Sequence, residues 1–194
     1  MEICHPPCIE ILTDFLADLK EHAGYRSIDC AGGDGRLSES FLQKHYSKVD
    51  LFDGCPLAVE KAKATLSHLS CFGYAEQAYM QDFRWRFYYS AIYMVWCVGY
   101  LERAQLVAFL KTAKSRLMAQ PGRMSRSSTP DSFIFVLDNV LSYGEKSVVI
   151  KRQRVRSQSE LEAIFHEAGL VVYKRSGRKT MPDPFRDVHV WALY

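Results

Sequence analysis

Short apolar segments alternate with segments of helical periodicity along most of the chain. The apolar segments are residues 25–31, 48–53, 71–79, 90–101 and 132–139. The helical segments are residues 9–22, 36–46, 56–69, 102–118 and 157–170. Buried strands separated by helices are typical of a mainly parallel sheet with helices on both faces. Residues 171–176 and 187–194 predict two more strands with no helix between them, so we expect the last strand to run antiparallel.

Size and composition are those of an ordinary globular protein. The chain has 194 residues, of which 48% are hydrophobic and 24% charged, with a formal net charge of +3. We expect one domain over residues 1–194, with an N-terminal helix segment at 1–24. Residues 119–132 are rich in Ser, Pro and Arg and predict a flexible surface insertion. The mild charge neither requires nor excludes nucleic acid.

The sequence also bears on the cellular compartment. No apolar segment is long enough to cross a membrane, and the N-terminus lacks the pattern of a secretory signal. We therefore expect no membrane partner and an intracellular location, cytoplasmic or nuclear. Six cysteines without a paired C-x-x-C spacing predict no metal site and suit a reducing compartment.

Residues 27–36 read SIDCAGGDGR and predict a strand that runs into a glycine-rich turn before a helix. Ligands of open α/β sheets bind beyond the carboxyl ends of the strands, where Gly33 and Gly35 would lie. Glycines allow close backbone approach, and the following helix offers free N–H groups. Asp53 ends the second predicted strand, where a carboxylate can accept both hydroxyls of a ribose. We expect an adenosine-containing ligand; NAD is the first alternative, and the segments further along argue against it.

Several segments occur in the order and spacing of a known family. They read IDCAGGDGR, VDLFD, MQDF, WCVGYL, LVAFLKTAKSRL, LDN, EAGL and PDPFRDVHVWALY. With these segments the chain resembles the protein alpha-N-terminal methyltransferases, from about Tyr25 to Tyr194. The resemblance implies a Rossmann-like class I methyltransferase fold that uses S-adenosylmethionine (SAM, also AdoMet). Its sheet would have seven strands, mainly parallel, with an antiparallel C-terminal strand.

The resemblance also implies which residues contact SAM. The cofactor-binding residues would be Gly33, Gly35, Arg36, Asp53, Met80 and Gln81. The two glycines would approach the methionine part, and Arg36 would grip its carboxylate with two parallel hydrogen bonds. Asp53 would hold the ribose hydroxyls, while Met80, Gln81 and the neighbouring Asp82 would surround the adenine. The chain departs from the family at Ala31, which replaces a glycine, and at Asp34, which replaces an apolar residue and could meet the SAM ammonium or repel its carboxylate.

On the acceptor side, the family uses an Asn, a His and an Asp to orient an amine and help it lose a proton. Asn139 matches the Asn, whereas Tyr100 stands at the His position and Lys151 at the Asp position. Tyrosine, with an ordinary pKa of about 10, is a poorer base at neutral pH than histidine at about 6.5. A lysine in place of an aspartate reverses the local charge and opposes binding of a cationic N-terminus.

Other acceptor-side positions are mixed. Trp96 matches an aromatic residue on the floor of the substrate channel, although a buried tryptophan on a core strand is common without any such role. Pro184 and Arg186 stand where the family has an acid and a tyrosine that line the channel. The resemblance therefore identifies Asn139 and Tyr100 as catalytic candidates, and Trp96 and Lys151 as channel candidates.

Two functions from different classes remain open. One is an active SAM-dependent methyltransferase whose protein or peptide acceptor is not a cationic N-terminus. The other is a catalytically inactive methyltransferase fold that serves as a structural or binding subunit in a protein or RNA-containing complex. The basic run Lys146–Arg156 offers the second function a surface, but a solvated loop and helix entry explains that run equally well.

Overall fold

A computed structural model describes residues 5–17, 24–118, 130–141, 147–150, 152–176 and 187–194. The strands are β1 (Gly24–Cys30), β2 (Tyr46–Asp53), β3 (Phe72–Gln77), β4 (Ala91–Val95), β5 (Phe133–Val140), β6 (Val148–Ile150), β7 (Gln153–Val155), β8 (Val172–Arg175) and β9 (Asp187–Leu193). The α-helices are α1 (His5–Ala17), α2 (Arg36–Ser40), α3 (Pro56–Leu66), α4 (Arg103–Ser115) and α5 (Gln158–Glu167). Three short 3₁₀ helices are also described: η1 (Leu42–Lys44), η2 (Met80–Asp82) and η3 (Val98–Tyr100).

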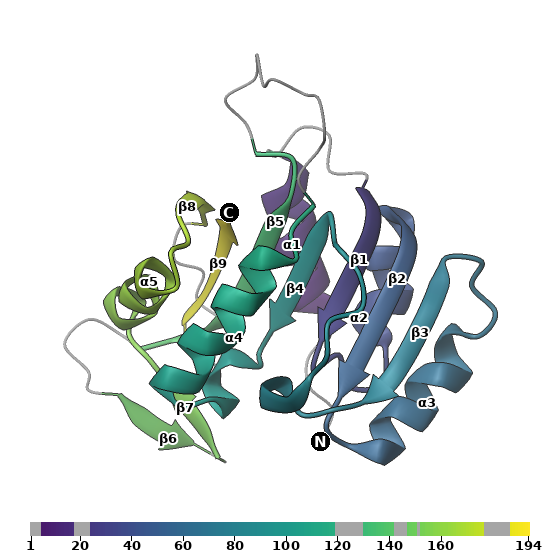
Figure 1. Cartoon of the computed structure of the whole chain (residues 1–194), viewed down its shortest axis with the longest axis horizontal. Coiled ribbons are helices and arrows are strands. Elements are labelled where there is room, and N and C mark those ends of the chain that lie inside the picture. Colours follow the sequence, from purple (N-terminus) through teal and green to yellow (C-terminus); the bar gives the residue numbers. More distant parts are fainter. Residues whose placement is uncertain (1–4, 18–23, 119–129, 142–146, 151, 177–186) are drawn as a thin grey trace. The chain divides into compact units, whose positions relative to one another are not determined.

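In the described part of the chain, seven strands form one sheet in the order β3-β2-β1-β4-β5-β9-β8 (Figure 1). The predicted α/β class and seven-stranded, mainly parallel sheet are therefore confirmed. The backbone divides into two compact units, Met1–Tyr93 and Met94–Tyr194. The single domain over 1–194 stays a prediction, as does the flexible insertion at 119–132, because residues 119–129 lie outside the described residues.

The N-terminal unit contains the parallel pairs β1–β2 and β2–β3. Helix α3 begins with Pro56 in its first turn, a position where the missing N–H of proline leaves no bond unmade. One apolar face of α3 packs on the two strands beneath it. That cluster consists of Val59, Ala62 and Leu66 from α3, Leu51 from β2 and Ala75 from β3. This packing fixes α3 relative to β2 and β3.

The segment of chain that connects β3 to β4, residues 80–90, forms only η2 and irregular chain. Its aromatic side chains cover part of the N-terminal unit. The ring of Phe83 stacks on Phe52 of β2 with centroids 4.0 Å apart. Trp85 contacts Phe83 edge-on, and Tyr89 contacts Trp85 in the same way. These rings bury sheet surface that a crossover helix covers in many α/β proteins.

The C-terminal unit contains the antiparallel strands. β9 runs antiparallel to both β5 and β8, which confirms the predicted direction of the last strand. Helix α5 packs on β9 through an edge-to-face contact of Phe165 and Trp191, whose centroids lie 5.6 Å apart. Ser157 caps α5 because its hydroxyl accepts a hydrogen bond from the amide of Glu160 at 3.2 Å. After this helix, Gly169 adopts a left-handed φ of 76°, a common way for a helix to end.

Two sequence-based expectations in this unit are wrong. The described part of Lys146–Arg156 forms a β6–β7 hairpin rather than a solvated loop, with Val148 opposite Val155 and Ile150 opposite Gln153. The fourth strand was expected to extend over 90–101, but β4 ends at Val95. Trp96 then takes a positive φ of 52°, which turns the chain away from the sheet and into η3.

Candidate functional site

The turn between β1 and α2 is built from residues in left-handed backbone conformations. Ala31, Gly33 and Gly35 have φ values of 53°, 58° and 83°. The amide of Gly32 donates to the carbonyl oxygen of Phe52 at 3.1 Å, which ties the turn to the end of β2. Glycine adopts such conformations without strain, but alanine does so at a cost of about 1 kcal/mol because of its Cβ. Ala31 is therefore a strained position in this loop.

The three glycines of the turn differ in what surrounds them. A Cβ at Gly32 would lie 2.6 Å from Cγ of Asp29, and one at Gly35 would lie 3.1 Å from Cδ1 of Leu66 on α3. A Cβ at Gly33 would meet no described atom within 4 Å. Gly32 and Gly35 thus permit close packing inside the unit. The open side of the loop is at Gly33, where a ligand can approach the backbone.

Asp53 connects this turn to the end of β2. Its Oδ2 accepts a hydrogen bond from the amide of Gly33 at 2.9 Å, and its Oδ1 accepts one from the amide of Cys55 at 2.8 Å. A carboxylate has about four lone-pair sites, so two remain for further donors. The sequence placed Gly33 and Asp53 at one site from the strand ends, and the structure brings them into direct contact.

Arg36 lies at the start of α2 and forms a short-range ion pair that the sequence did not indicate. Its Nε donates to Oδ1 of Asp34 at 2.8 Å, and Nζ of Lys61 donates to Oδ2 of the same carboxylate at 2.8 Å. Partial burial acts to raise the pKa of Asp34, but the hydrogen bonds from Lys61 and Arg36 outweigh it and hold this pKa below its ordinary value. Asp34 is thus a carboxylate held between two cations.

Met80 and Gln81 form η2, which follows β3. Met80 is buried, with 7% of its surface exposed, whereas Gln81 is exposed. Tyr79, which sequence reasoning missed, precedes them with 59% of its surface exposed. A Cβ at Gly54 would lie 2.7 Å from its ring, so the ring packs directly against the backbone that follows Asp53. The only signal in the sequence was a glycine immediately after Asp53.

Beneath the turn lies a buried carboxyl that was also missed. Asp29 of β1 is 1% exposed and accepts a hydrogen bond from Oγ of Ser38 at 2.9 Å. Burial raises the pKa of Asp29 to about 7, the Ser38 hydrogen bond acts against this rise, and the nearby Asp53 charge adds to it. The charge of Asp53 and the burial of Asp29 therefore both disfavour the ionised form of Asp29.

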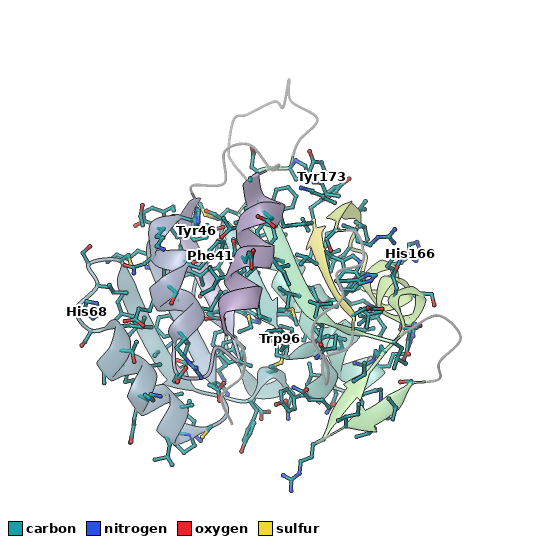
Figure 2. The ribbon with its side chains drawn as sticks, turned by 180° about the vertical axis from the view of Figure 1, so that it is seen from behind. Phe41, Tyr46, His68, Trp96, His166 and Tyr173 are labelled. Atoms are coloured by element: carbon teal, nitrogen blue, oxygen red, sulfur yellow. The ribbon has the colours of Figure 1, made fainter. Side chains whose placement is uncertain are left out.

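In the C-terminal unit, Trp96 and Asn139 lie at neighbouring strand ends. Trp96, labelled in Figure 2, follows β4, and its amide donates to the carbonyl oxygen of Leu137 at 2.8 Å. Asn139 lies two residues after Leu137 on β5. Among the described residues, the buried Nε1 of Trp96 and the buried Oδ1 of Asn139 have no hydrogen-bond partner. Such unpaired buried polar atoms are rare because each costs about 1–3 kcal/mol.

A set of side chains that sequence reasoning missed holds the Trp96–Leu101 turn. Gln153 of β7 donates to the carbonyl oxygen of Trp96 at 3.1 Å. The buried Arg156 donates to the carbonyl oxygens of Val98 at 3.0 Å and Leu101 at 2.6 Å. The amide of Val98 donates to Oδ2 of Asp138 at 3.2 Å.

Tyr100 lies on this turn with 58% of its surface exposed. The hairpin therefore determines where Tyr100 sits.

Some predicted positions cannot be placed. Lys151, Pro184 and Arg186 lie outside the described residues. Within the described ranges, no group of three or more His, Cys, Asp and Glu side chains is arranged to hold a metal ion. None of the helices in the described chain is long and apolar enough to span a bilayer.

Known proteins resemble this chain over most of its length. Residues 9–194 match the sequence profile of the family described as AdoMet dependent proline di-methyltransferase. An alpha N-terminal protein methyltransferase 1 from Oryza sativa subsp. indica is 24% identical over 179 residues, which cover 86% of this chain and 53% of that protein. An N-terminal Xaa-Pro-Lys N-methyltransferase 1 from Danio rerio is 27% identical over 175 residues, covering 86% of this chain and 71% of that protein.

A solved structure agrees with these sequence matches. A SAM-dependent methyltransferase from Leishmania major superposes with a TM-score of 0.83 at 27% identity, covering 96% of this chain and 71% of that one. The chain spans about half the length of the rice relative it matches. Because the family profile covers nearly the whole chain, this protein belongs to the AdoMet dependent proline di-methyltransferase family.

Proposed function

We propose that this chain binds SAM in its N-terminal unit and transfers the methyl group of SAM to a protein acceptor. Membership of an AdoMet-dependent family supports the proposal. The observation that carries it is the contact between Gly33 and Asp53. This contact puts a carboxylate with spare acceptor capacity beside a stretch of backbone with open space above it.

The residues of the turn fit the ligand chemically. Asp53 can accept hydrogen bonds from both ribose hydroxyls while it keeps the two amide donors that orient it. Gly33 leaves room for the ligand to pass close to the backbone. The guanidinium of Arg36 uses Nε for Asp34, and its Nη groups can donate to the carboxylate of the methionine part. Gly35, Met80 and Gln81 complete the proposed cofactor site.

When bound, SAM supplies a methyl group on a sulfonium, and the chain must present a nucleophile to it. We place this task on Asn139, whose buried Oδ1 has no partner among the described residues. That oxygen can accept an N–H of the acceptor amine and so fix the direction of the nitrogen lone pair. Nε1 of Trp96, which has no partner in the described ranges either, can donate to a carbonyl oxygen of the same acceptor. An amine next to a peptide carbonyl satisfies both groups.

The acceptor differs from those implied by the relatives' names. Tyr100 is exposed on its turn where the family has a histidine, so this position offers no good base at neutral pH. An amine would have to arrive unprotonated. We therefore propose that a protein amine is methylated in its neutral form, and that strongly cationic N-termini are poor acceptors.

The experiment is transfer of labelled methyl groups from SAM to a peptide library at several pH values. Asn139→Ala should lower kcat/KM by at least about tenfold, the lower end of what an orienting contact contributes. Glu167→Gln, an exposed substitution on α5, is the matched control and should leave the rate unchanged. Label transfer that survives Asn139→Ala would show that Asn139 does not hold the acceptor.

A second candidate is a non-catalytic binding subunit, in a protein or RNA-containing complex. The exposed Tyr100 at the position of a catalytic histidine favours it. The same labelling experiment separates the two candidates. If SAM binds but no peptide or protein in a whole-cell lysate becomes labelled at any pH, the chain is a binding subunit rather than an enzyme.

A further inference from the structure

Lys61 reaches from α3 to the cofactor loop, 27 residues away along the chain. Its Nζ pairs with Oδ2 of Asp34 at 2.8 Å, and Arg36 takes Oδ1 of the same carboxylate at 2.8 Å. The Asp34 side chain is only 15% exposed, whereas those of Arg36 and Lys61 are 41% and 68% exposed. Asp34 is therefore the inner member of this group of three charges.

The charges of the group decide what a ligand carboxylate would meet. Without Lys61, the negative charge of Asp34 would cancel the positive charge of Arg36, so the pair would be neutral. The carboxylate of Asp34 would then repel the carboxylate of a ligand. Lys61 adds a second positive charge, so the three side chains together carry a net charge of +1. Because the hydrogen bond from Arg36 to Asp34 uses Nε, the N–H groups on its two Nη atoms remain as further donors.

We propose that Lys61 is a positioning and charge-compensating residue of the cofactor site, which neutralises Asp34 so that Arg36 can bind the carboxylate of SAM. This inference rests on the proposed function, because it concerns how the same site recognises the methionine part of its ligand. It also explains how a loop with an aspartate at position 34 keeps a cationic face. Lys61 itself contacts Asp34 and has no need to contact the ligand.

The test measures binding rather than activity, by calorimetric titration of the full chain. Two ligands are compared: SAM, which carries the carboxylate, and 5′-methylthioadenosine, which lacks the amino-acid part. Lys61→Met should weaken SAM binding about two- to fivefold, the range expected for an exposed ion pair, and leave 5′-methylthioadenosine unchanged. The loss should shrink at high salt, because salt screens exposed charges. Lys63→Met removes a charge from the same helix without removing a partner of Asp34, and should change neither affinity.

The double variant Asp34→Asn/Lys61→Met distinguishes charge compensation from a structural role. With both charges removed, Arg36 again presents one positive charge, so SAM affinity should return to that of the unsubstituted chain. If the loss persists in the double variant, or if both ligands weaken equally, Lys61 acts by holding the loop and the inference is wrong. Unchanged SAM affinity in Lys61→Met would overturn it as well. Failure of the unsubstituted chain to bind either ligand would instead overturn the proposed function, and this inference with it.

Discussion

The guanidinium of Arg156 donates a hydrogen bond to the carbonyl oxygen of Leu101 at 2.6 Å, across 55 residues of the chain. The same side chain donates to the carbonyl oxygen of Val98 at 3.0 Å, so one buried arginine pairs two carbonyls of the turn after β4. Arg156 follows β7 directly, which means that the hairpin and the turn are fixed to each other by a side chain. The position of Tyr100 depends on this connection.

Arg156→Met should lower the free energy of unfolding by about 2–3 kcal/mol, because it removes the side-chain donor to the buried carbonyl of Leu101 and one of the two donors to that of Val98. Urea unfolding monitored by circular dichroism measures the change. Arg152→Met, at an exposed arginine in the hairpin turn, is the matched control and should change stability by less than about 0.5 kcal/mol. Equal effects of the two substitutions would show that the buried contacts of Arg156 contribute nothing.

Ala31→Gly should stabilise the chain by about 1 kcal/mol, since it removes the Cβ from a residue with φ of 53°. The opposite kind of substitution at a neighbouring position, Gly33→Ala, should lower stability by a similar amount. This loss would come from backbone strain alone, because no described atom lies within 4 Å of the added Cβ. Thermal unfolding of the two variants checks both signs. A destabilising Ala31→Gly would mean that the turn does not hold its left-handed conformation in solution.

The buried carboxyl of Asp138 should make stability depend on pH. Burial raises the pKa of Asp138 to about 7, while hydrogen bonds from the amides of Asn139 and Val98 act against the rise. An aspartate in an unfolded chain has a pKa of about 3.9. The folded protein therefore binds more protons than the unfolded chain between about pH 4 and 7, so the contribution of Asp138 to stability is lost as pH rises through this range.

Asp138→Asn should remove this contribution. Relative to the unsubstituted chain, the variant should gain stability as pH rises from about 4 to 7, by at most about 1.4 kcal/mol per pH unit, and then stay level. Urea unfolding at a series of pH values measures the difference. A difference that does not change with pH would show that Asp138 is ionised throughout.

Tyr100→His tests the acceptor chemistry. If the acceptor amine must arrive unprotonated, kcat/KM of the unsubstituted chain should rise with pH up to about 8, the ordinary pKa of an α-amine. A histidine at this exposed position can accept the proton, so the variant should react at least about tenfold faster at pH 7 and show a flatter pH profile. Tyr100→Phe should behave as the unsubstituted chain. A profile that Tyr100→His leaves unchanged would place the proton acceptor elsewhere.

The sequence predicted those parts of the fold that depend on local patterns. Apolar segments indicated the strands of the main sheet, and helical periodicity over 56–69 and 157–170 indicated α3 and α5. The β6–β7 hairpin was not predicted, because its strands have three residues each. Its turn also uses Arg152, with φ of 69°, in place of the usual glycine or asparagine. The end of β4 was missed because Trp96, like Arg152, is an unusual residue for a left-handed conformation.

The candidate site was predictable where it follows from strand ends, and not where it depends on long-range pairing. Gly33 follows β1 and Asp53 ends β2, and the ends of adjacent parallel strands meet at one edge of the sheet. Lys61 is exposed on a helix and looks like an ordinary solvated lysine in the sequence, although it pairs with Asp34. Arg156 belongs to a basic run, and its burial appears only once the hairpin has folded over the turn.

Calorimetric titration of the full chain with SAM, alongside Asp53→Ala, tests the central claim most directly. We predict saturable binding with one site per chain, and a loss of at least about tenfold in affinity for Asp53→Ala, because one charged group loses its hydrogen bonds to the ribose. Thermal unfolding of the variant controls for loss of fold. Absence of binding at millimolar SAM, or affinity that Asp53→Ala leaves intact, would contradict the claim that this turn holds the cofactor.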